Sequence, residues 1–336
     1  MIKISSVGKY LDQPILTAKL NKKIPVILTA ASTVFTVNEI RKAEPQERKK
    51  TGLKLGIILG ATIISASNAS KIASYITKRP VKKLSNIIEE NTKTVTEILE
   101  DTTLSKKLSP ILEKAKDKIL TLKEVDTLNK GMKKSTLNKL IPDPENITSK
   151  DIFKEIGWLS IFGIIPVAGG IAGGIVADKL TEKNWKDRVS NKIKEGLYQY
   201  LANIFMCNIG AGAALAILEK ANIRSKAARC VGMVSGILLT GVIGGSAIAN
   251  FIGNKFINPV ILKSKKEDHR TPELLDLGLH TDDIATVSLL SGLKWIEPSL
   301  PLLYAVSGYR AGIGYRNDHK HHSSNEKQAH FLRAKC

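Results

Sequence analysis

Three long stretches without any charged side chain constrain this chain more than any other feature. Residues 156–177, 197–218 and 230–254 contain no Asp, Glu, Lys or Arg. A helix of about 22 residues measures about 33 Å, enough to cross the roughly 30 Å hydrocarbon core of a bilayer. Pro166 lies inside the first stretch, where a transmembrane helix tolerates proline better than a soluble helix does. The sequence therefore predicts three membrane-spanning helices.

Two further regions are apolar but less regular. Residues 24–40 and 52–70 flank a charged link that contains Pro45, and they predict a helical hairpin that crosses the membrane or dips into it. The apolar run 24–37 alone is too short to span a bilayer. Residues 284–309 form the last apolar region, which charged residues and prolines interrupt at its centre. We expect one or two additional spans there.

The region 78–155 is polar and has a different pattern. Apolar residues recur at intervals of three, four and seven in two runs, the first starting at Leu84 and the second extending from Leu108 to Leu122. This spacing predicts amphipathic helices with one apolar face. Ser109 and Pro110 are typical of a helix start. We therefore interpret this polar, amphipathic region as a helical insert outside the membrane, and the near balance of its opposite charges argues against a nucleic-acid-binding arm.

The predicted fold class is all-α, a polytopic helical membrane protein with Gly-rich transmembrane helices and a helical extramembrane insert. We divide the chain into an N-terminal segment (1–77), the amphipathic region (78–155), a Gly-rich membrane domain (156–309) and a basic, histidine-bearing tail (310–336). An alternative is a soluble helical interaction protein, which would need a large core or a partner to cover three uncharged helices.

The net charge of the chain is +20, from 51 Lys and Arg against 31 Asp and Glu. Such an excess attracts nucleic acid or anionic lipid. The lysines are spread over all hydrophilic segments and only 5% of residues are aromatic, so we do not expect nucleic acid as a partner. Lys or Arg flank each apolar stretch, which indicates anionic headgroups of membrane lipids, and we expect a multi-pass protein of the cell inner membrane. Basic loops occur on both sides, so the positive-inside rule leaves the orientation open.

Small residues recur at every fourth position in several apolar stretches, the pattern known as GxxxG or glycine zipper. They lie on one helix face and let two helix backbones approach closely. Two uses stay open, namely packing between helices of one chain and self-association into a homo-oligomer or pore. The residues that we assign to helix packing are Gly52, Gly56, Gly60, Gly169, Gly170, Gly173, Gly174, Gly232, Gly236, Gly241, Gly245, Ala249 and Gly253.

The last apolar region contains the one arrangement that fits a transport site. Lys294 and Glu297 are three residues apart, close enough to pair on one helix face, and Pro298 and Pro301 would break the helix after them. Broken helices with ionisable groups at mid-depth mark ion or substrate paths in transporters. The alternative is that two short elements meet at the membrane surface, with Trp295 as an interfacial anchor.

No motif for catalysis or cofactor binding occurs in the sequence. It has no GxxxxGK[ST], GxGxxG after a strand, HExxH or GxSxG pattern, and its three cysteines include no CxxC pair. The histidines of 318–330 lie in a polar tail that supplies no fixed ligand geometry. We therefore predict no catalytic residue, no cofactor and no metal site. The expected role is not enzymatic but structural, as a scaffold or membrane organiser, with a transporter or channel component as the alternative.

Overall fold

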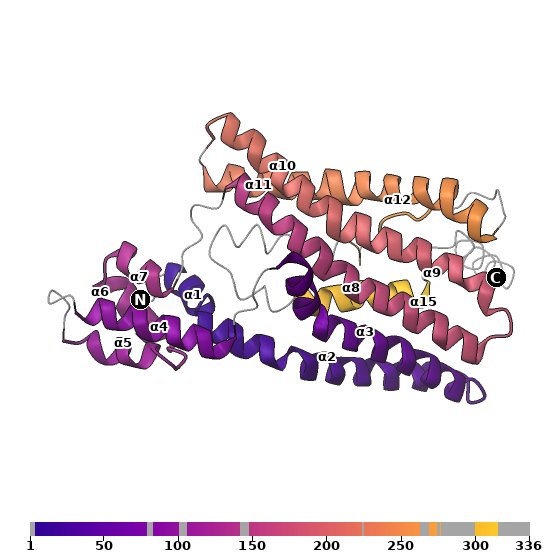
Figure 1. The fold of residues 1–336 in the computed structure, drawn as a ribbon, viewed down its shortest axis with the longest axis horizontal. Helices are drawn as coiled ribbons and strands as arrows, with labels where there is room; N and C mark the ends of the chain where they lie inside the picture. The colour runs from indigo at the N-terminus through magenta and orange to yellow at the C-terminus, as the bar shows by residue number, and fades with distance from the viewer. Residues whose placement is uncertain are drawn as a thin grey trace, which may run out of the picture.

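The computed structural model describes residues 4–78, 83–100, 106–141, 148–223, 225–262, 269–273, 276 and 300–314. All regular secondary structure in these residues is helical, which confirms the all-α prediction (Figure 1). The elements are α1 (Ile4–Leu11), α2 (Pro14–Lys42), α3 (Arg48–Thr77), α4 (Leu84–Leu99), α5 (Ser109–Ala115), α6 (Leu122–Gly131), α7 (Lys134–Leu140), α8 (Ser149–Thr181), α9 (Trp185–Tyr200), η1 (Leu201–Phe205), α10 (Met206–Lys220), α11 (Lys226–Gly236), η2 (Ile237–Gly245), α12 (Ser246–Ile252), η3 (Gly253–Leu262) and α15 (Leu300–Ile313).

Short helices form a subdomain at one end of the molecule, where α1 packs with α4–α7 (Figure 1). The apolar faces of α4–α7 meet in a core in which Val95, Leu112 and Leu128 are fully buried. Helix α1 joins them through polar contacts, since the Ser6 hydroxyl donates to Asp126 Oδ1 at 2.7 Å. The first residues of the chain therefore pack with the amphipathic region, from which the α2–α3 hairpin separates them in sequence.

The second predicted amphipathic run, 108–122, contains α5 and a short non-helical link, and α6 begins at its last residue, Leu122. Gln13 binds this link at Leu120, whose N–H donates to Gln13 Oε1 at 2.7 Å and whose carbonyl accepts from Nε2 at 3.0 Å. Thr121 then starts α6 with a capping box, in which the Thr121 N–H donates to Glu124 Oε2 at 2.6 Å. The spacing predicts one continuous helix over 108–122, and this prediction is wrong. The backbone groups of Leu120 and Thr121 bind the side chains of Gln13 and Glu124, so they do not form the hydrogen bonds of a continuous helix.

Helices α2 and α3 form an antiparallel hairpin that links the subdomain to the bundle of long helices (Figure 1). Ile24 and Leu28 of α2 pack with Ala66 of α3 in one buried cluster. Helix α2 is 29 residues long, about twice the apolar run 24–37, because it starts in the subdomain with a proline in its first turn.

Four helices in the described part of the chain are long and apolar enough to cross a membrane: Arg48–Thr77, Ile152–Thr181, Trp185–Lys220 and Val231–Val260. The last three contain the uncharged stretches or nearly all of them, and the first contains the 52–70 arm of the hairpin. Trp185–Lys220 joins α9, η1 and α10, and Val231–Val260 runs from α11 to η3 through two π-helical segments.

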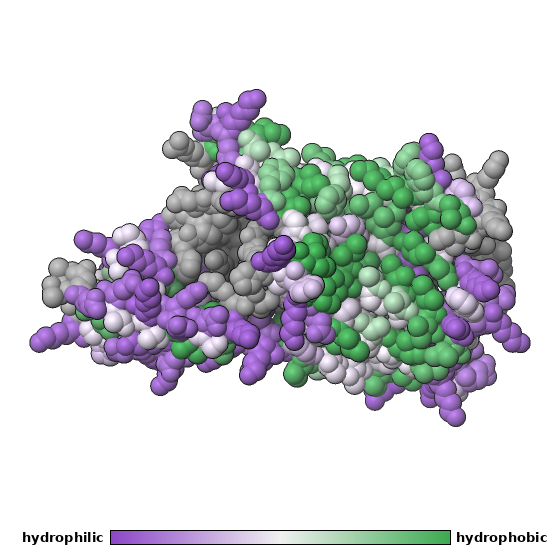
Figure 2. All heavy atoms as spheres, viewed as in Figure 1, coloured by the Kyte–Doolittle hydropathy of each residue, from purple (hydrophilic) through white to green (hydrophobic). Residues whose placement is uncertain are grey.

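The bundle has an apolar surface and a partly polar interior. Figure 2 shows an apolar belt over the long helices, with hydrophilic side chains at both ends and over the subdomain. Leu239 is 63% exposed, Phe251 56% and Val260 76%. In contrast, Ser246 of the same helix and Asn203 of the Trp185–Lys220 helix are buried. Large apolar side chains of the long helices therefore point outward, and polar side chains point inward.

Candidate functional site

A row of polar side chains lies along the buried face of α9 and η1. Glu195, Gln199 and Asn203 are each four residues apart, so they share one helix face. Gln199 Nε2 donates to Glu195 Oε1 at 2.8 Å, and Asn203 Nδ2 donates to Gln199 Oε1 at 2.9 Å. Asn203 Nδ2 also lies 3.4 Å from Asp276 Oδ1. All three residues of the row lie in the Trp185–Lys220 helix.

Arg270 lies at the centre of the charged groups that meet this row. Its Nε is 3.3 Å from Glu195 Oε2 and its Nη2 is 2.9 Å from Asp276 Oδ2, and all three side chains are almost fully buried. The guanidinium also lies over the Tyr198 ring, 4.4 Å from its centroid. Burial alone would lower the pKa of Arg270, but the two carboxylates raise it above its ordinary value, so the group stays charged.

Arg310 of α15 completes the cluster. Its Nη1 is 3.5 Å from Asp276 Oδ1 and its Nε is 3.7 Å from Glu195 Oε1. A third carboxylate, Glu273 Oε2, lies 3.3 Å from Arg310 Nη2 and is partly exposed. We call the four buried groups the ionic core: Glu195, Arg270, Asp276 and Arg310. Two carboxylates face two guanidinium groups, so the formal charges of the ionic core cancel.

The ionic core holds a non-helical segment, residues 269–273, against the bundle. The Asn250 side chain pairs with the Arg270 backbone, accepting from its N–H at 2.9 Å and donating to its carbonyl at 2.9 Å. The Glu273 N–H donates to Asp276 Oδ2 at 2.8 Å. Backbone N–H and C=O groups that are buried outside regular secondary structure need such hydrogen-bond partners. The segment therefore links α9, α12 and α15 through both backbone and side-chain contacts.

A second buried ion pair lies near the C-terminal ends of α8 and α15. Lys192 Nζ is 2.9 Å from Asp178 Oδ2, and both side chains are at most 1% exposed. Lys54 of α3 approaches the same carboxylate at 2.8 Å. Lys192 also donates to the Gly312 and Ile313 carbonyls at 2.6 and 3.2 Å, at the end of α15 where carbonyls lack helical partners. This pair joins four helices at one end of the bundle.

Glu182 extends these contacts outward at the α8–α9 turn. Its carboxylate lies 3.1 Å from Lys50 and 3.2 Å from Arg188. Burial raises the pKa of Glu182, but the hydrogen bond from Lys50 and the nearby Arg188 lower it below its ordinary value. We call these contacts the turn cluster: Lys50, Lys54, Asp178, Glu182, Arg188 and Lys192.

At the opposite end of the bundle, one carboxylate caps α8. Glu219 accepts from the Ser149 N–H at 3.0 Å and from the Ser149 hydroxyl at 2.6 Å. Arg229 lies 3.6 Å from the same carboxylate. A negative charge at a helix N-terminus is favourable because free N–H groups point toward it. This contact ties α8 to the turn between α10 and α11.

Several of the glycines assigned to helix packing lie where two backbones touch. A Cβ atom on Gly170 would overlap the Gly308 carbonyl, and one on Gly174 would overlap the Gly312 carbonyl. Gly169 and Gly173 face Ser65 and Ala61 of α3 in the same way. Helix α8 thus approaches α3 with one pair of glycines and α15 with the next pair.

The 230–254 stretch approaches the preceding helix in a similar manner. A Cβ atom on Gly236 would overlap the Gly210 carbonyl, and one on Gly241 would overlap Cys207 Sγ. A Cβ atom on Gly245 would lie 2.7 Å from Ala202 Cα. Such distances leave no room for a larger residue, so the backbones of these two helices pack directly on each other.

The other assigned residues have more varied surroundings. A Cβ atom on Gly232 would lie 2.6 Å from Leu218 Cδ1, and one on Gly52 would lie 3.0 Å from Ile40 Cδ1. Ala249 is 4% exposed and lies in a buried cluster with Tyr198. Gly253 only touches Lys194 at ordinary contact distance, and Cβ atoms on Gly56 and Gly60 would meet no described atom within 4 Å.

The predicted transport residues Lys294, Glu297 and Pro298, together with Trp295, lie outside the described residues. Pro301 is the second residue of α15, in the first turn, where proline is tolerated because its missing N–H has no helical partner. Helix α15 continues to Ile313, past the predicted end of the apolar region at 309. The histidines of 318–330 also lie outside the described residues.

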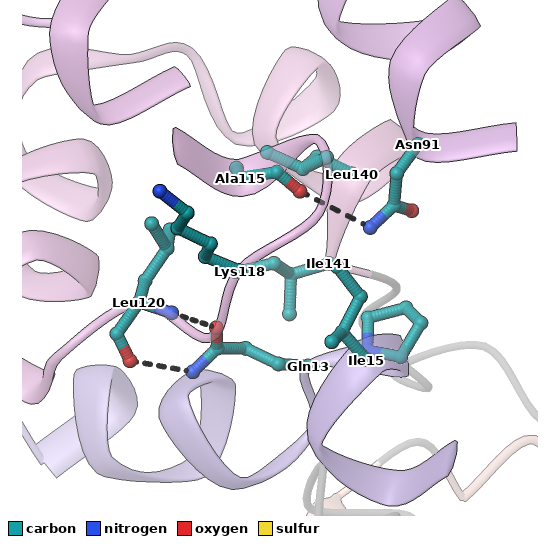
Figure 3. Close-up of a pocket in the computed structure, with 9 residues that line it drawn as sticks. Gln13, Ile15, Asn91, Ala115, Lys118, Leu120, Leu140 and Ile141 are labelled. Atoms are coloured by element: carbon teal, nitrogen blue, oxygen red, sulfur yellow. Dashed lines mark hydrogen bonds between the residues drawn. The ribbon is translucent and has the colours of Figure 1, made fainter. Parts of the chain in front are cut away.

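A small pocket lies where the start of α2 meets the subdomain (Figure 3). Gln13 and Leu120 form their paired hydrogen bonds at its edge, and Asn91 Nδ2 donates to the Ala115 carbonyl at 3.3 Å (Figure 3). Its free volume of about 10 Å³ is room for a single water molecule. The pocket is a packing defect at a junction and is too small for an organic ligand.

In the part of the chain that the structure describes, no group of three or more His, Cys, Asp or Glu side chains has a geometry that could hold a metal ion. No protein-family model, curated protein or solved structure matches this chain.

Sequence reasoning missed the ionic core and the turn cluster. Residues 178–196, which separate two of the uncharged stretches, contain the start of α9 at Trp185, and Arg310, the first residue of the predicted tail, is 4% exposed within α15. One signal was available, because Glu195, Gln199 and Asn203 continue a single helix face into an apolar stretch. The partner Arg270 is 75 residues from Glu195, and no local pattern indicates that pairing.

Proposed function

We propose that this chain is an integral membrane protein whose helical bundle anchors the N-terminal subdomain at a membrane surface, in a structural or scaffold role. The observation that carries the proposal is the distribution of side chains in the bundle. Apolar side chains such as Leu239, Ile243 and Val260 point outward, while Asn203, Gln199 and the ionic core face inward.

This distribution is favourable in lipid and unfavourable in water. Soluble monomers rarely expose continuous apolar patches of more than a few hundred Å², since each Å² of apolar surface in water costs about 25 cal/mol. Within a bilayer, the outward apolar side chains need no cover, and polar side chains avoid hydrocarbon by facing other helices. The close glycine contacts between α8, α3 and α15 fit the same environment, where dispersion contacts replace the hydrophobic effect.

The proposed role is not enzymatic. The buried charges of the ionic core are bound to each other and to the helices that they join, rather than lining an open cleft. Such groups fix the helices relative to one another. The bundle then holds the subdomain, through α2, at a constant position next to the membrane.

Alkaline carbonate extraction of membranes tests the proposal, and two substitutions sharpen the test. Leu239→Lys with Ile243→Lys places two charges on the outward face of η2, where each would cost about 3 kcal/mol in a bilayer. We expect wild-type protein to resist extraction and the double variant to lose membrane retention or to be degraded. The control is Lys183→Glu, a charge change at the exposed α8–α9 turn, which we expect to leave retention unchanged.

In a soluble protein the two lysines would replace exposed side chains and would do little harm. Release of wild-type protein by carbonate, or a soluble and stable Leu239→Lys, Ile243→Lys variant, would therefore refute the membrane proposal.

A second candidate is a channel or transporter component, favoured by the polar row of Glu195, Gln199 and Asn203 inside the bundle. Polar and ionisable groups inside a membrane-spanning bundle often line ion paths, and this row combines one carboxylate with two amides. Proton flux into proteoliposomes, followed with a pH-sensitive dye, tests it. The candidate predicts flux that Asn203→Leu, or Lys294→Ala with Glu297→Ala, abolishes. Flux equal to that of protein-free liposomes would contradict it.

A further inference from the structure

Three lysines lie on one face of α2 between the subdomain and the bundle. Lys19, Lys22 and Lys23 are spaced at i, i+3 and i+4, and Val26 continues the same face at i+7. Lys22 and Lys23 are exposed, and Val26 is 70% exposed. Residues 14–38 contain no Asp or Glu, so α2 itself supplies no counter-charge to these lysines.

Helix α3 carries a similar face near its C-terminal end. Lys71 and Tyr75 are spaced at i and i+4, Lys78 is the left-handed residue that ends the helix, and Tyr75 is 86% exposed. Ile72 and Ile76, beside them, are also exposed. Residues 48–88 contain no Asp or Glu. Both helices thus place exposed cations within one turn of exposed apolar or aromatic side chains.

The two faces lie at similar heights along the hairpin. Because α2 and α3 are antiparallel and Ile24 and Ala66 belong to one buried cluster, the lysines that precede Ile24 lie on the same side of this cluster, along the hairpin, as those that follow Ala66. We call these five lysines the basic collar: Lys19, Lys22, Lys23, Lys71 and Lys78. None of them forms an ion pair within the described residues.

The other end of the same hairpin differs. There Lys42 pairs with Glu39 at 2.8 Å, Lys50 with Glu182 at 3.1 Å, and Lys54 with Asp178. The chain therefore neutralises many cations at the turn end through its own carboxylates, whereas the basic collar retains its charge for an external anion.

We propose that the basic collar binds anionic phospholipid headgroups of the leaflet next to the subdomain. This inference rests on the proposed membrane location. Each lysine near an anionic leaflet contributes about 1 kcal/mol, and long lysine side chains reach headgroups while their stems lie on apolar surface. The apolar neighbours decide between partners, because Val26, Tyr75 and Ile76 would enter the bilayer interface, whereas a nucleic acid would leave them in water.

The test compares lipid binding by the full chain in detergent, measured by native mass spectrometry with phosphatidylglycerol and phosphatidylcholine as probes. The collar variant combines Lys22→Gln, Lys23→Gln and Lys71→Gln. The matched control combines Lys49→Gln, Lys179→Gln and Lys183→Gln, three exposed lysines at the turn end that also lack an ion pair in the described residues. We expect the preference for phosphatidylglycerol to fall by about fivefold for each collar lysine removed, and to persist in the control.

The preference should also weaken at about 1 M salt, where the Debye length shrinks to about 3 Å. Equal loss of preference in both variants, or an unchanged preference in the collar variant, would overturn the assignment. Binding of a single-stranded oligonucleotide that the collar substitutions abolish, without any lipid preference, would assign a nucleic acid instead. Carbonate extraction separates these outcomes from a failure of the membrane proposal, because a protein that stays in membranes but shows no collar effect contradicts only the lipid site.

Discussion

Removal of Arg270 is the perturbation for which the structure predicts the largest effect. Its side chain is fully buried, and its partners Glu195 and Asp276 are at most 1% exposed. Arg270→Met keeps much of the volume but leaves two buried carboxylates opposite the single guanidinium of Arg310. Breaking one partner out of a buried pair costs about 3–5 kcal/mol, because the remaining charge is neither hydrated nor compensated.

For a chain of 336 residues, such a loss corresponds to a fall of about 4–7 °C in the apparent melting temperature. Cys207 offers a direct assay, since its thiol is fully buried and would react with a fluorogenic maleimide only on unfolding. The background carries Cys230→Ala and Cys336→Ser, so that the signal comes from one position. The control is Arg188→Met, which removes an arginine that is half exposed and should cost less than about 1 kcal/mol.

A second substitution tests the charge argument itself. Adding Asp276→Asn to Arg270→Met leaves one carboxylate opposite one guanidinium, Glu195 and Arg310, and keeps an oxygen that can accept from the Glu273 N–H. We expect this double variant to be more stable than Arg270→Met alone. The reasoning is refuted if Arg270→Met unfolds at the same temperature as Arg188→Met, or if Asp276→Asn lowers its stability further.

Two more predictions concern packing and pH. Gly170→Ala directs a Cβ atom into the Gly308 backbone and should lower the free energy of unfolding by about 1–3 kcal/mol, whereas Gly60→Ala meets open space and should raise it by up to about 1 kcal/mol. The same thiol assay measures both variants, and equal effects would contradict the packing interpretation. Burial raises the pKa of Glu124, but hydrogen bonds from Lys114 and Thr121 lower this pKa below its ordinary 4.5. The stabilising effect of the Glu124 carboxylate is therefore present above about pH 4.5 and is lost as the pH falls through the lowered pKa. The protection factors of the amides in 109–131, which compare each measured exchange rate with the intrinsic rate at the same pH, should therefore decrease below that pH. Glu124→Gln should remove this dependence, and protection factors that do not change with pH would contradict it.

The long helices were predictable from sequence because their signal is local. A stretch of about 22 residues without a charge has few structural options, and the structure places 156–177, 197–218 and all but the first residue of 230–254 in helices that are long and apolar enough to span a membrane. The length of α2 was not predictable in this way, since residues 17–23 include three lysines, a threonine and an asparagine that interrupt the apolar pattern ahead of 24–37. The position of α1 depends on Ser6 and Asp126, which are 120 residues apart.

The buried charges illustrate a different limit. Asp178, Lys192 and Glu195 lie at the ends of apolar stretches, where loops and helices have the same composition. Whether such a residue is exposed or buried depends on the exact turn at which the helix starts and on a partner elsewhere in the chain. For Lys192 this partner set includes the last carbonyls of α15, 120 residues away, which no periodicity in the sequence reveals.

The ionic core satisfies the backbone of the non-helical segment 269–273 and also joins α9 to α15. A segment that lies against the long apolar helices without helical hydrogen bonds must find partners for its backbone, and Asn250 and Asp276 supply them. Asp276 would be unfavourable there as an isolated charge, and Arg270 and Arg310 compensate it. Because the same arginines also bind Glu195 of α9, the groups that satisfy the segment also fix α15 against α9. The polar atoms inside this bundle therefore determine which helices are neighbours, while the apolar surface determines only the solvent in which the bundle is stable.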